Sequence, residues 1–225
     1  MLDIELNKKI ILTKIKQAHK KSNFSLLPIP KLVAVSKQQE DYKIDDSLAS
    51  GQTIFGENRV QEAQQRWERR LEIYKDIKLR LIGPLQTNKI KQALNLFDII
   101  ETIDREKLAK EIAKNFNNSL KTKSFYIQVN TGSEPQKSGL IPSEVDSFVN
   151  YCINDLKLPI NGLMCIPPQD EEPSMHFAFL RKIAKRNNLT ELSMGMSNDF
   201  EEAIKFGATS VRIGSLFFGA REIQS

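Results

Sequence analysis

The chain has 225 residues, of which 40% are hydrophobic and 27% are charged, with a formal net charge of +5. This composition is ordinary for one large globular domain or two small ones with a substantial buried core. No apolar run approaches the roughly 18 residues of a membrane span, and the amino terminus lacks the apolar stretch of a signal peptide, so we expect a cytoplasmic protein without a membrane partner.

The cysteine, histidine and basic residues exclude two further classes of protein. Two cysteines and two histidines are too few for a disulfide framework or a metal site. The lysines and arginines are spread over helical faces with acidic residues nearby, and no zinc-finger, aromatic-platform or helix-turn-helix pattern accompanies them. We therefore expect no metal and no nucleic-acid partner, and anionic small ligands suit the charge equally well.

Predicted strands and helices alternate along the chain. A charged, helically periodic segment, Leu2–Lys21 within residues 1–22, predicts an extra amino-terminal helix. Short apolar, β-branched segments then predict eight strands: Leu32–Ser36, Thr53–Gly56, Leu79–Gly83, Ile99–Ile103, Phe125–Asn130, Ile160–Ile166, Leu192–Met196 and Ser210–Gly214. The intervals carry helical patterns, among them Asn58–Ile73, Thr87–Leu96, Arg105–Asn115, Ser143–Ile153, Glu172–Asn187 and Asn198–Phe206.

This alternation predicts an α/β fold with a parallel sheet. The strands read as nearly continuous apolar runs, which suits parallel strands buried on both faces, and eight successive units close most naturally into a (β/α)8 barrel of the TIM type. A doubly wound open sheet is the alternative. Because almost nothing follows the eighth strand beyond Gly219–Ser225, we expect a single domain over residues 1–225, with the barrel at residues 31–221.

Lys37 is the first candidate functional residue. The first predicted strand runs straight into Ser36 and Lys37, which places a lysine amine at the exit of a buried strand. Loss of solvation at a water-poor site lowers the pKa of a lysine and makes the neutral amine a nucleophile towards aldehydes. The alternative is that Lys37 is one more solvated lysine in a chain with 33 lysines and arginines.

The ends of the seventh and eighth strands carry groups that suit an anion. In a TIM barrel, ligands bind at the carboxyl ends of the strands, commonly with phosphate after strands seven and eight. Ser197 follows strand seven, where Asn198 and Glu201 predict a capping pair for the next helix. Strand eight delivers a guanidinium, an unobstructed backbone and a hydroxyl, from Arg212, Gly214 and Ser215. Singly, each residue is also explained by a helix cap, a turn or a structural ion pair.

Together, these groups predict a ligand with an aldehyde at one end and a phosphate at the other. Lys37 faces the aldehyde, and the ends of strands seven and eight face the phosphate. Pyridoxal 5'-phosphate (PLP) has this shape, and phosphorylated aldoses have it as well. The residues alone therefore leave a PLP-binding protein and a Schiff-base aldolase or isomerase open.

Seven segments, in this order, resemble the pyridoxal phosphate homeostasis protein family: KLVAVSKQ, FGENRVQEA, LIGPLQTNKIK, VNTGSEPQKSGL, GLMCIPP, LSMGMSNDFEEAI and VRIGSLFFGAR. The resemblance implies the barrel known from the amino-terminal part of alanine racemases, with PLP held as a Schiff base. By similarity, Lys37 carries the PLP. The family's phosphate-binding positions fall on Ser197, Arg212, Gly214 and Ser215, and its pocket-lining positions fall on Asn58, Met194 and Gly195.

Several residues near these segments carry more than one interpretation. Arg80 stands where many relatives have histidine. Met196 alternates away from its neighbours in the strand, which leaves both core packing and a pocket position open. Lys137 is either a surface charge, which we favour, or a second aldehyde-reactive amine. Glu57 either contacts the ligand, pairs with Arg59 or caps a helix.

A pyridoxal enzyme needs more than a Schiff base, because racemisation requires an acid and a base on opposite faces of the cofactor. In the similar racemases the opposite-face group comes from a further domain or a partner subunit, whereas this chain stops soon after strand eight. We therefore expect a non-catalytic protein that buffers PLP and hands it to apo forms of PLP-dependent enzymes, and the family resemblance implies a monomer. A single-domain amino-acid racemase and an aldolase for phosphorylated sugars are the alternatives.

Overall fold

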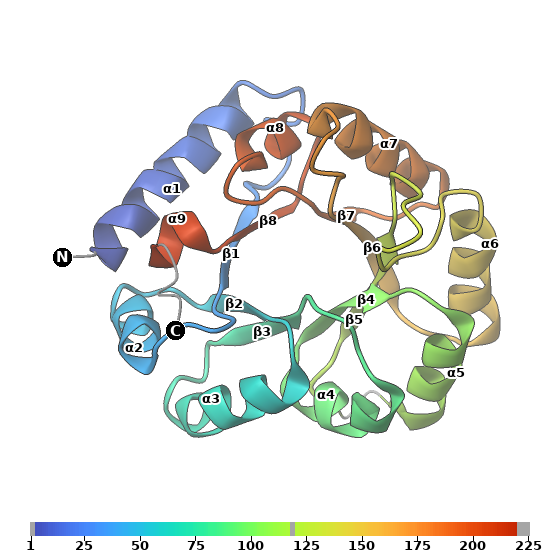
Figure 1. Ribbon diagram of the computed structural model, residues 1–225, viewed down its shortest axis with the longest axis horizontal. Coiled ribbons are helices and arrows are strands. Elements are labelled where there is room, and N and C mark those ends of the chain that lie inside the picture. Colours follow the sequence, from blue (N-terminus) through green and yellow to red (C-terminus); the bar gives the residue numbers. More distant parts are fainter. Residues whose placement is uncertain (1–2, 118–119, 220–225) are drawn as a thin grey trace.

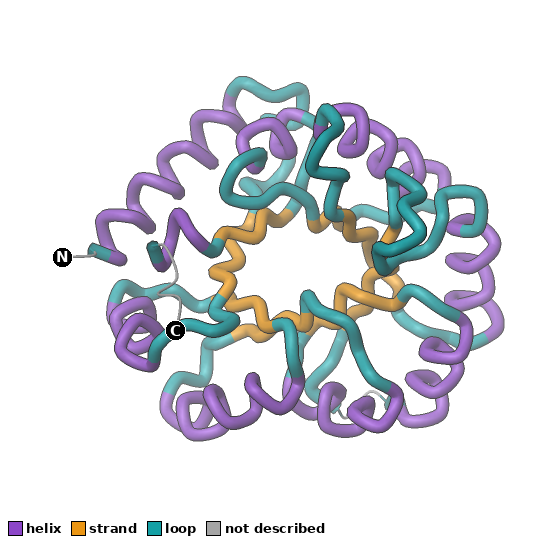
Figure 2. Tube along the Cα trace, in the orientation of Figure 1, coloured by secondary structure: helices purple, strands orange, loops and turns teal. Residues whose placement is uncertain are grey.

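Eight parallel strands close into a barrel in the computed structural model, which describes residues 3–117 and 120–219 (Figures 1 and 2). Each strand pairs with the next in the chain, and the eighth pairs with the first. The strands are β1 Lys31–Val35, β2 Ile54–Glu57, β3 Lys78–Leu81, β4 Ile99–Ile103, β5 Ser124–Val129, β6 Ile160–Cys165, β7 Glu191–Ser193 and β8 Ser210–Ile213. The closed order confirms the predicted (β/α)8 barrel and excludes the open sheet.

Helices surround the barrel on the outside (Figure 1). They are α1 Ile4–Lys20, α2 Asp41–Ala49, α3 Val60–Ile73, α4 Ile90–Leu96, α5 Glu106–Asn115, α6 Val145–Asn150, α7 Pro173–Arg186, α8 Phe200–Lys205 and α9 Ser215–Phe218. A 3-10 turn, η1 Thr87–Lys89, precedes α4, and a π-helical turn, η2 Tyr151–Asp155, follows α6. Residues 1–2 of the predicted first helix and residues 220–221 of the predicted barrel lie outside the described residues.

Three local features differ from the sequence prediction. The helix α2 was not predicted, because its nine residues are mostly polar and bury only two apolar side chains, Ile44 and Leu48. The short helix α9 was not predicted either. The seventh strand ends at Ser193 rather than Met196, because Gly195 has a φ of +91°, a left-handed conformation that ends the extended strand.

The core lies between the barrel and its helices, and α1 extends it. Ile11 and Ile15 of α1 are buried in the same core as the barrel strands, whereas Ile10 on the opposite face is 47% exposed. The helix begins at an effective cap, since the Asp3 carboxylate accepts a hydrogen bond from the Leu6 amide at 2.9 Å. It packs against α2, α8 and α9, so it covers the barrel wall beside β1 and β8 (Figure 1).

Among residues 3–117 and 120–219, no helix has both the length and the apolar character needed to cross a membrane. In the same part of the chain, no three histidine, cysteine, aspartate or glutamate side chains gather in a way that suits a metal ion.

The packing of α1 predicts unequal losses of stability when Ile15 and Ile10 are truncated. Ile15→Ala removes a fully buried side chain and should lower the free energy of unfolding by about 2–5 kcal/mol. Ile10→Ala truncates the same side chain on the exposed face and should change it by only about 0.5 kcal/mol. Urea denaturation followed by circular dichroism measures both; equal losses would show that α1 does not dock as described.

Candidate binding site at the carboxyl end of the barrel

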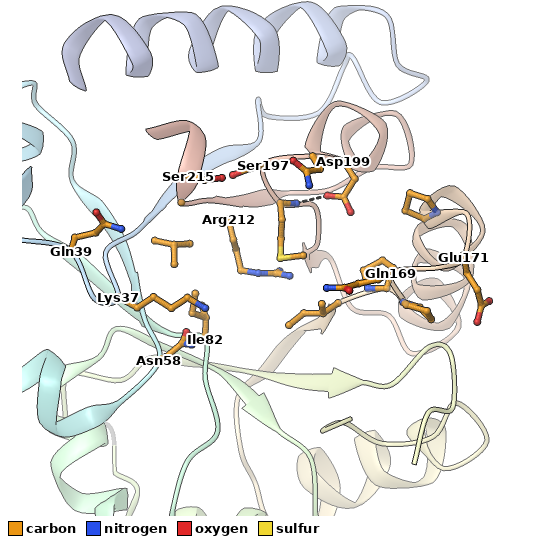
Figure 3. A pocket seen from close by; sticks show the side chains of 18 of the residues that line it. Lys37, Gln39, Asn58, Ile82, Gln169, Glu171, Ser197, Asp199, Arg212 and Ser215 are labelled. Carbon is orange, nitrogen blue, oxygen red and sulfur yellow. Dashed lines mark hydrogen bonds between the residues drawn. The ribbon is translucent and has the colours of Figure 1, made fainter. Parts of the chain in front are cut away.

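A cavity of about 700 Å³ opens at the carboxyl ends of the strands (Figure 3). Its volume is in the range of small-molecule sites, roughly 300–1,000 Å³. Its walls come mainly from the segments that follow β1, β2, β6, β7 and β8. The lining residues are Val35, Lys37, Gln39, Asn58, Ile82, Ile166, Pro167, Pro168, Gln169, Glu171, Pro173, Met196, Ser197, Asn198, Asp199, Arg212, Gly214, Ser215 and Gly219.

Lys37 enters this cavity from a turn that directly follows β1. Its side chain is half-buried and points into the cavity beside Asn58 (Figure 3). The turn closes through a hydrogen bond from the Gln39 amide to the Ser36 carbonyl at 3.2 Å. Asn58 is held close by the backbone of Gly83, where an added Cβ would collide with the Asn58 carbonyl. The local structure thus delivers an amine and an amide to the same wall.

A buried carboxylate holds the Lys37 turn from below. Glu57 is fully buried, and its Oε1 accepts hydrogen bonds from the Ser36 hydroxyl at 2.7 Å, Arg66 Nη1 at 2.9 Å and Trp67 Nε1 at 2.9 Å. Arg66 also donates from Nη2 to the Gln39 carbonyl at 3.2 Å. The residues on both sides of Lys37 are therefore tied to α3.

This arrangement decides among the three roles that the sequence left open for Glu57: contact with the ligand, pairing with Arg59 or capping a helix. Arg59 pairs instead with Glu62 at 2.9 Å on the surface of α3. The partner of Glu57 is Arg66, which lies two helical turns further along. Glu57 does not line the cavity, so it supports the Lys37 turn rather than forming part of the wall.

The opposite wall carries hydroxyls and a guanidinium. The side chains of Ser197 and Ser215 point toward one another above Arg212 (Figure 3). Gly214 lies between β8 and Ser215 and lines the same wall. This wall faces Lys37 across the cavity, so an amine and a set of anion-binding donors lie on opposite sides of one site.

The predicted capping pair of Asn198 and Glu201 is wrong. The helix α8 begins at Phe200, and neither side chain caps it. Asp199 instead accepts a hydrogen bond from the Met196 amide at 2.6 Å, and Glu201 pairs with Lys14 of α1 at 3.1 Å. Gly195 turns the chain out of the strand, and the Asp199 side chain then holds the segment after β7 in a turn through its bond to the backbone.

Arg212 forms the floor of the cavity and is 4% exposed. It donates from Nη1 to the Ser193 hydroxyl and from Nη2 to the Cys165 carbonyl, both at 2.8 Å. Burial lowers the pKa of Arg212, against the opposing effect of Glu101, yet an arginine starts so high that it stays protonated. Burial also raises the pKa of the Cys165 thiol to about 12, so this neighbour remains neutral.

Six of the eight residues proposed from the sequence line the cavity: Lys37, Asn58, Ser197, Arg212, Gly214 and Ser215. Met194 and Gly195 do not. Met194 is fully buried in the hydrophobic core, and an added Cβ at Gly195 would press against Ala203 of α8. Met196 is the methionine that lines the cavity, since the strand has ended before it and regular alternation no longer applies.

Other lining residues were not singled out from the sequence. Ile166, Pro167 and Pro168 directly follow β6, in the quoted segment GLMCIPP, and Gln169 and Glu171 continue that wall. Because they directly follow a predicted strand, their position in the sequence could have identified them as candidate lining residues. Lys137 lies behind this wall, where it pairs with Glu134 at 2.5 Å and its side chain is 30% exposed.

Comparisons with known proteins place this geometry in a family. Residues 15–222 match the family model "Alanine racemase, N-terminal domain". The chain is 37% identical over 202 residues to the pyridoxal phosphate homeostasis protein of Aquifex aeolicus, which covers 85% of this chain and 87% of that protein. It is 34% identical over 230 residues to the protein of the same name from Haemophilus influenzae, covering 98% and 97%. The chain belongs to the pyridoxal phosphate homeostasis protein family.

Solved structures agree with this assignment. PipY of Synechococcus elongatus without PLP superposes with a TM-score of 0.79 at 33% identity, covering 91% of this chain and all of that one. PipY with PLP bound superposes with a TM-score of 0.76 at 32% identity over the same shares. Alanine racemase of Corynebacterium glutamicum, at 17% identity and a TM-score of 0.70, matches 99% of this chain but 62% of its own, and shows the shared fold.

The support of the Lys37 turn predicts a large effect of Glu57→Gln. The change removes the charge from a fully buried carboxylate, whose partner Arg66 is only 14% exposed, and should lower the free energy of unfolding by about 3–5 kcal/mol. It should also shift the fluorescence of Trp67, the single tryptophan, whose indole N–H bonds to Glu57. Glu62→Gln breaks the exposed pair with Arg59 and should cost less than about 1 kcal/mol. Similar losses in both variants would contradict the described role.

Proposed function

We propose that this protein holds PLP reversibly as a Schiff base on Lys37, and that it buffers and delivers PLP in the cytoplasm without catalysing a reaction of its own. The observation that carries the proposal is that the Lys37 amine faces Arg212, Ser197 and Ser215 within one cavity. The names of the curated relatives and the PLP-bound structure of PipY support it.

The chemistry of the lining residues fits PLP. A primary amine suits the aldehyde, while two hydroxyls, the backbone around Gly214 and a guanidinium suit the phosphate and ring. When bound, PLP supplies an aldehyde that condenses with a primary amine and releases water. Apolar groups from Val35 and Ile82 provide surfaces for the flat ring between the two ends.

The protein's own residues set the reversibility of this attachment. Lys37 is half-buried, so its amine lies at the boundary between the cavity and solvent. Its turn is held on both sides through Glu57 and Arg66, which fixes where the amine stands. Water that reaches Lys37 restores the free amine and releases the aldehyde, as expected of a carrier for apo forms of PLP-dependent enzymes.

The lining residues argue against acid–base catalysis on two faces of PLP. Among the described residues, no tyrosine, histidine or cysteine lines the cavity. The two carboxylates that do are engaged elsewhere: Glu171 pairs with His176 at 3.2 Å, and Asp199 accepts the Met196 amide. Racemisation needs a second proton-transfer group opposite the lysine. We therefore favour the carrier over the single-domain racemase.

Borohydride reduction tests the attachment. Protein incubated with PLP and reduced should carry one phosphopyridoxyl group on the peptide that contains Lys37, identified by mass spectrometry. Lys37→Ala should lose this label, whereas Lys137→Ala should keep it, because Lys137 is engaged with Glu134 behind the wall. An unlabelled Lys37 in the presence of excess PLP would remove the central claim, and a label on Lys137 alone would move the site.

Proton exchange tests the absence of catalysis. With L-alanine in deuterated water, PLP-loaded protein at stoichiometric concentration should exchange the α-proton no faster than free PLP at the same concentration. Proton NMR follows the α-proton signal, and chiral chromatography follows D-alanine. Faster exchange that is lost in Lys37→Ala would establish the racemase alternative.

A further inference from the structure

A buried polar array lies inside the barrel beneath the cavity. Arg212 of β8 contacts Ser193 of β7, and Ser193 donates to Glu101 of β4 at 2.5 Å. Arg80 of β3 donates to Glu101 at 2.9 Å and to Ser210 of β8 at 3.1 Å. β4 and β7 are not neighbours in the barrel, and neither are β3 and β8, so these contacts cross the interior. All five side chains are at most 4% exposed.

The hydrogen bonds from Arg212 to Ser193 and from Ser193 to Glu101 have the same donor-to-acceptor direction. A serine hydroxyl has a single hydrogen, and Ser193 donates it to Glu101 Oε2. The hydroxyl oxygen of Ser193 therefore accepts the hydrogen bond from Arg212 Nη1. Since Arg212 is also held at Nη2 by the Cys165 carbonyl, two points fix the plane of the guanidinium. A guanidinium has five N–H groups, so further donors of Arg212 remain for a ligand in the cavity.

The charges of the array favour an anion above it. Glu101 is the one carboxylate in the five-residue array, and it lies between two guanidiniums. Burial is the largest single influence and lowers the pKa of Arg80, but Glu101, Tyr126 and Glu191 together outweigh it, so the pKa of Arg80 is raised. Within the array, Arg80 and Glu101 thus balance each other and leave the positive charge of Arg212, on which the Asp199 carboxylate of the cavity wall also acts.

We propose that Ser193 and Glu101 are positioning residues: through them, the barrel interior orients the Arg212 guanidinium for an anionic ring-and-phosphate ligand. The inference deepens the proposed function and rests on it for the identity of that ligand. Arg80 holds Glu101 in place from the far side. The competing explanation is that the array only stabilises the barrel.

Alanine substitutions of two serines in the array distinguish the positioning role from a purely structural one. Ser193 and Ser210 are both fully buried and form a register pair between β7 and β8. Ser193 bonds to Arg212, whereas the described side-chain bond of Ser210 is to Arg80. Truncation to alanine removes one buried hydroxyl in each case. If the array is purely structural, the two substitutions should change ligand affinity to the same extent. If Ser193 positions Arg212, ligand affinity should differ between the two variants.

The test compares wild type, Ser193→Ala and Ser210→Ala in a titration with PLP followed by the visible absorption of the bound chromophore. Ser193→Ala should weaken binding by about tenfold or more, because Arg212 loses one of its two fixed points. Its absorption maximum should also shift, which loss of stability alone does not produce. Ser210→Ala should stay within about twofold of wild type, even where the two melting temperatures fall equally. Equal affinity and equal spectra in the two variants would overturn the inference.

A second variant and a second ligand cover two cases: Ser193→Ala does not fold, or PLP does not attach to Lys37. If Ser193→Ala does not fold, Ser193→Cys replaces the hydroxyl with a weaker donor and acceptor of similar shape and should show the same loss of affinity. Pyridoxine 5'-phosphate, which has no aldehyde, tests Arg212 without Lys37. If borohydride leaves wild-type Lys37 unlabelled, the proposed attachment fails. Weaker binding of pyridoxine 5'-phosphate to Ser193→Ala than to Ser210→Ala would still support the positioning role, and equal binding would refute it.

Discussion

The pairing of the first strand with the last is the constraint on which the site depends. The register from Lys31 opposite Ser210 to Ala34 opposite Ile213 brings the exits of β1 and β8 to the same edge of the barrel. Lys37 follows one exit and Gly214 follows the other. Because parallel strands of a closed barrel all end on one face, this pairing brings Lys37 and Gly214 to the same site, where the anion-binding wall lies across the cavity from the amine.

Two buried carboxylates then give the site its rigidity, one on each side. Glu57 lies outside the barrel wall and joins the Lys37 turn to α3 through Arg66 and Trp67. Glu101 lies inside the barrel and reaches Arg212 through Ser193. Buried carboxylates are costly unless donors compensate them, and each lies where several donors converge, although among the described residues Oε2 of Glu57 has no hydrogen-bond partner. Neither lines the cavity, which separates the residues that meet a ligand from those that hold them in place.

The fold has the same barrel as the alanine racemases, and the residues that line its cavity suit the binding of PLP. An amine, hydroxyls and one guanidinium are sufficient to hold an aldehyde and a phosphate. Proton transfer on both faces of the ring needs further groups with suitable geometry, and Glu171 and Asp199 are already bonded within their own loops.

The amino-acid sequence by itself determined the barrel, the alternation of its strands and helices, and the candidate residues at the ends of β1, β7 and β8. These follow from short-range patterns: apolar runs, turn residues and the position of a polar side chain just after a strand. The tertiary structure alone decided which of them meet. It placed Met196 rather than Met194 in the cavity, gave Glu57 the partner Arg66, and joined Arg212 to Glu101 across the barrel. Such contacts depend on strand register and closure, because a side chain's neighbours across a barrel lie far away in the chain.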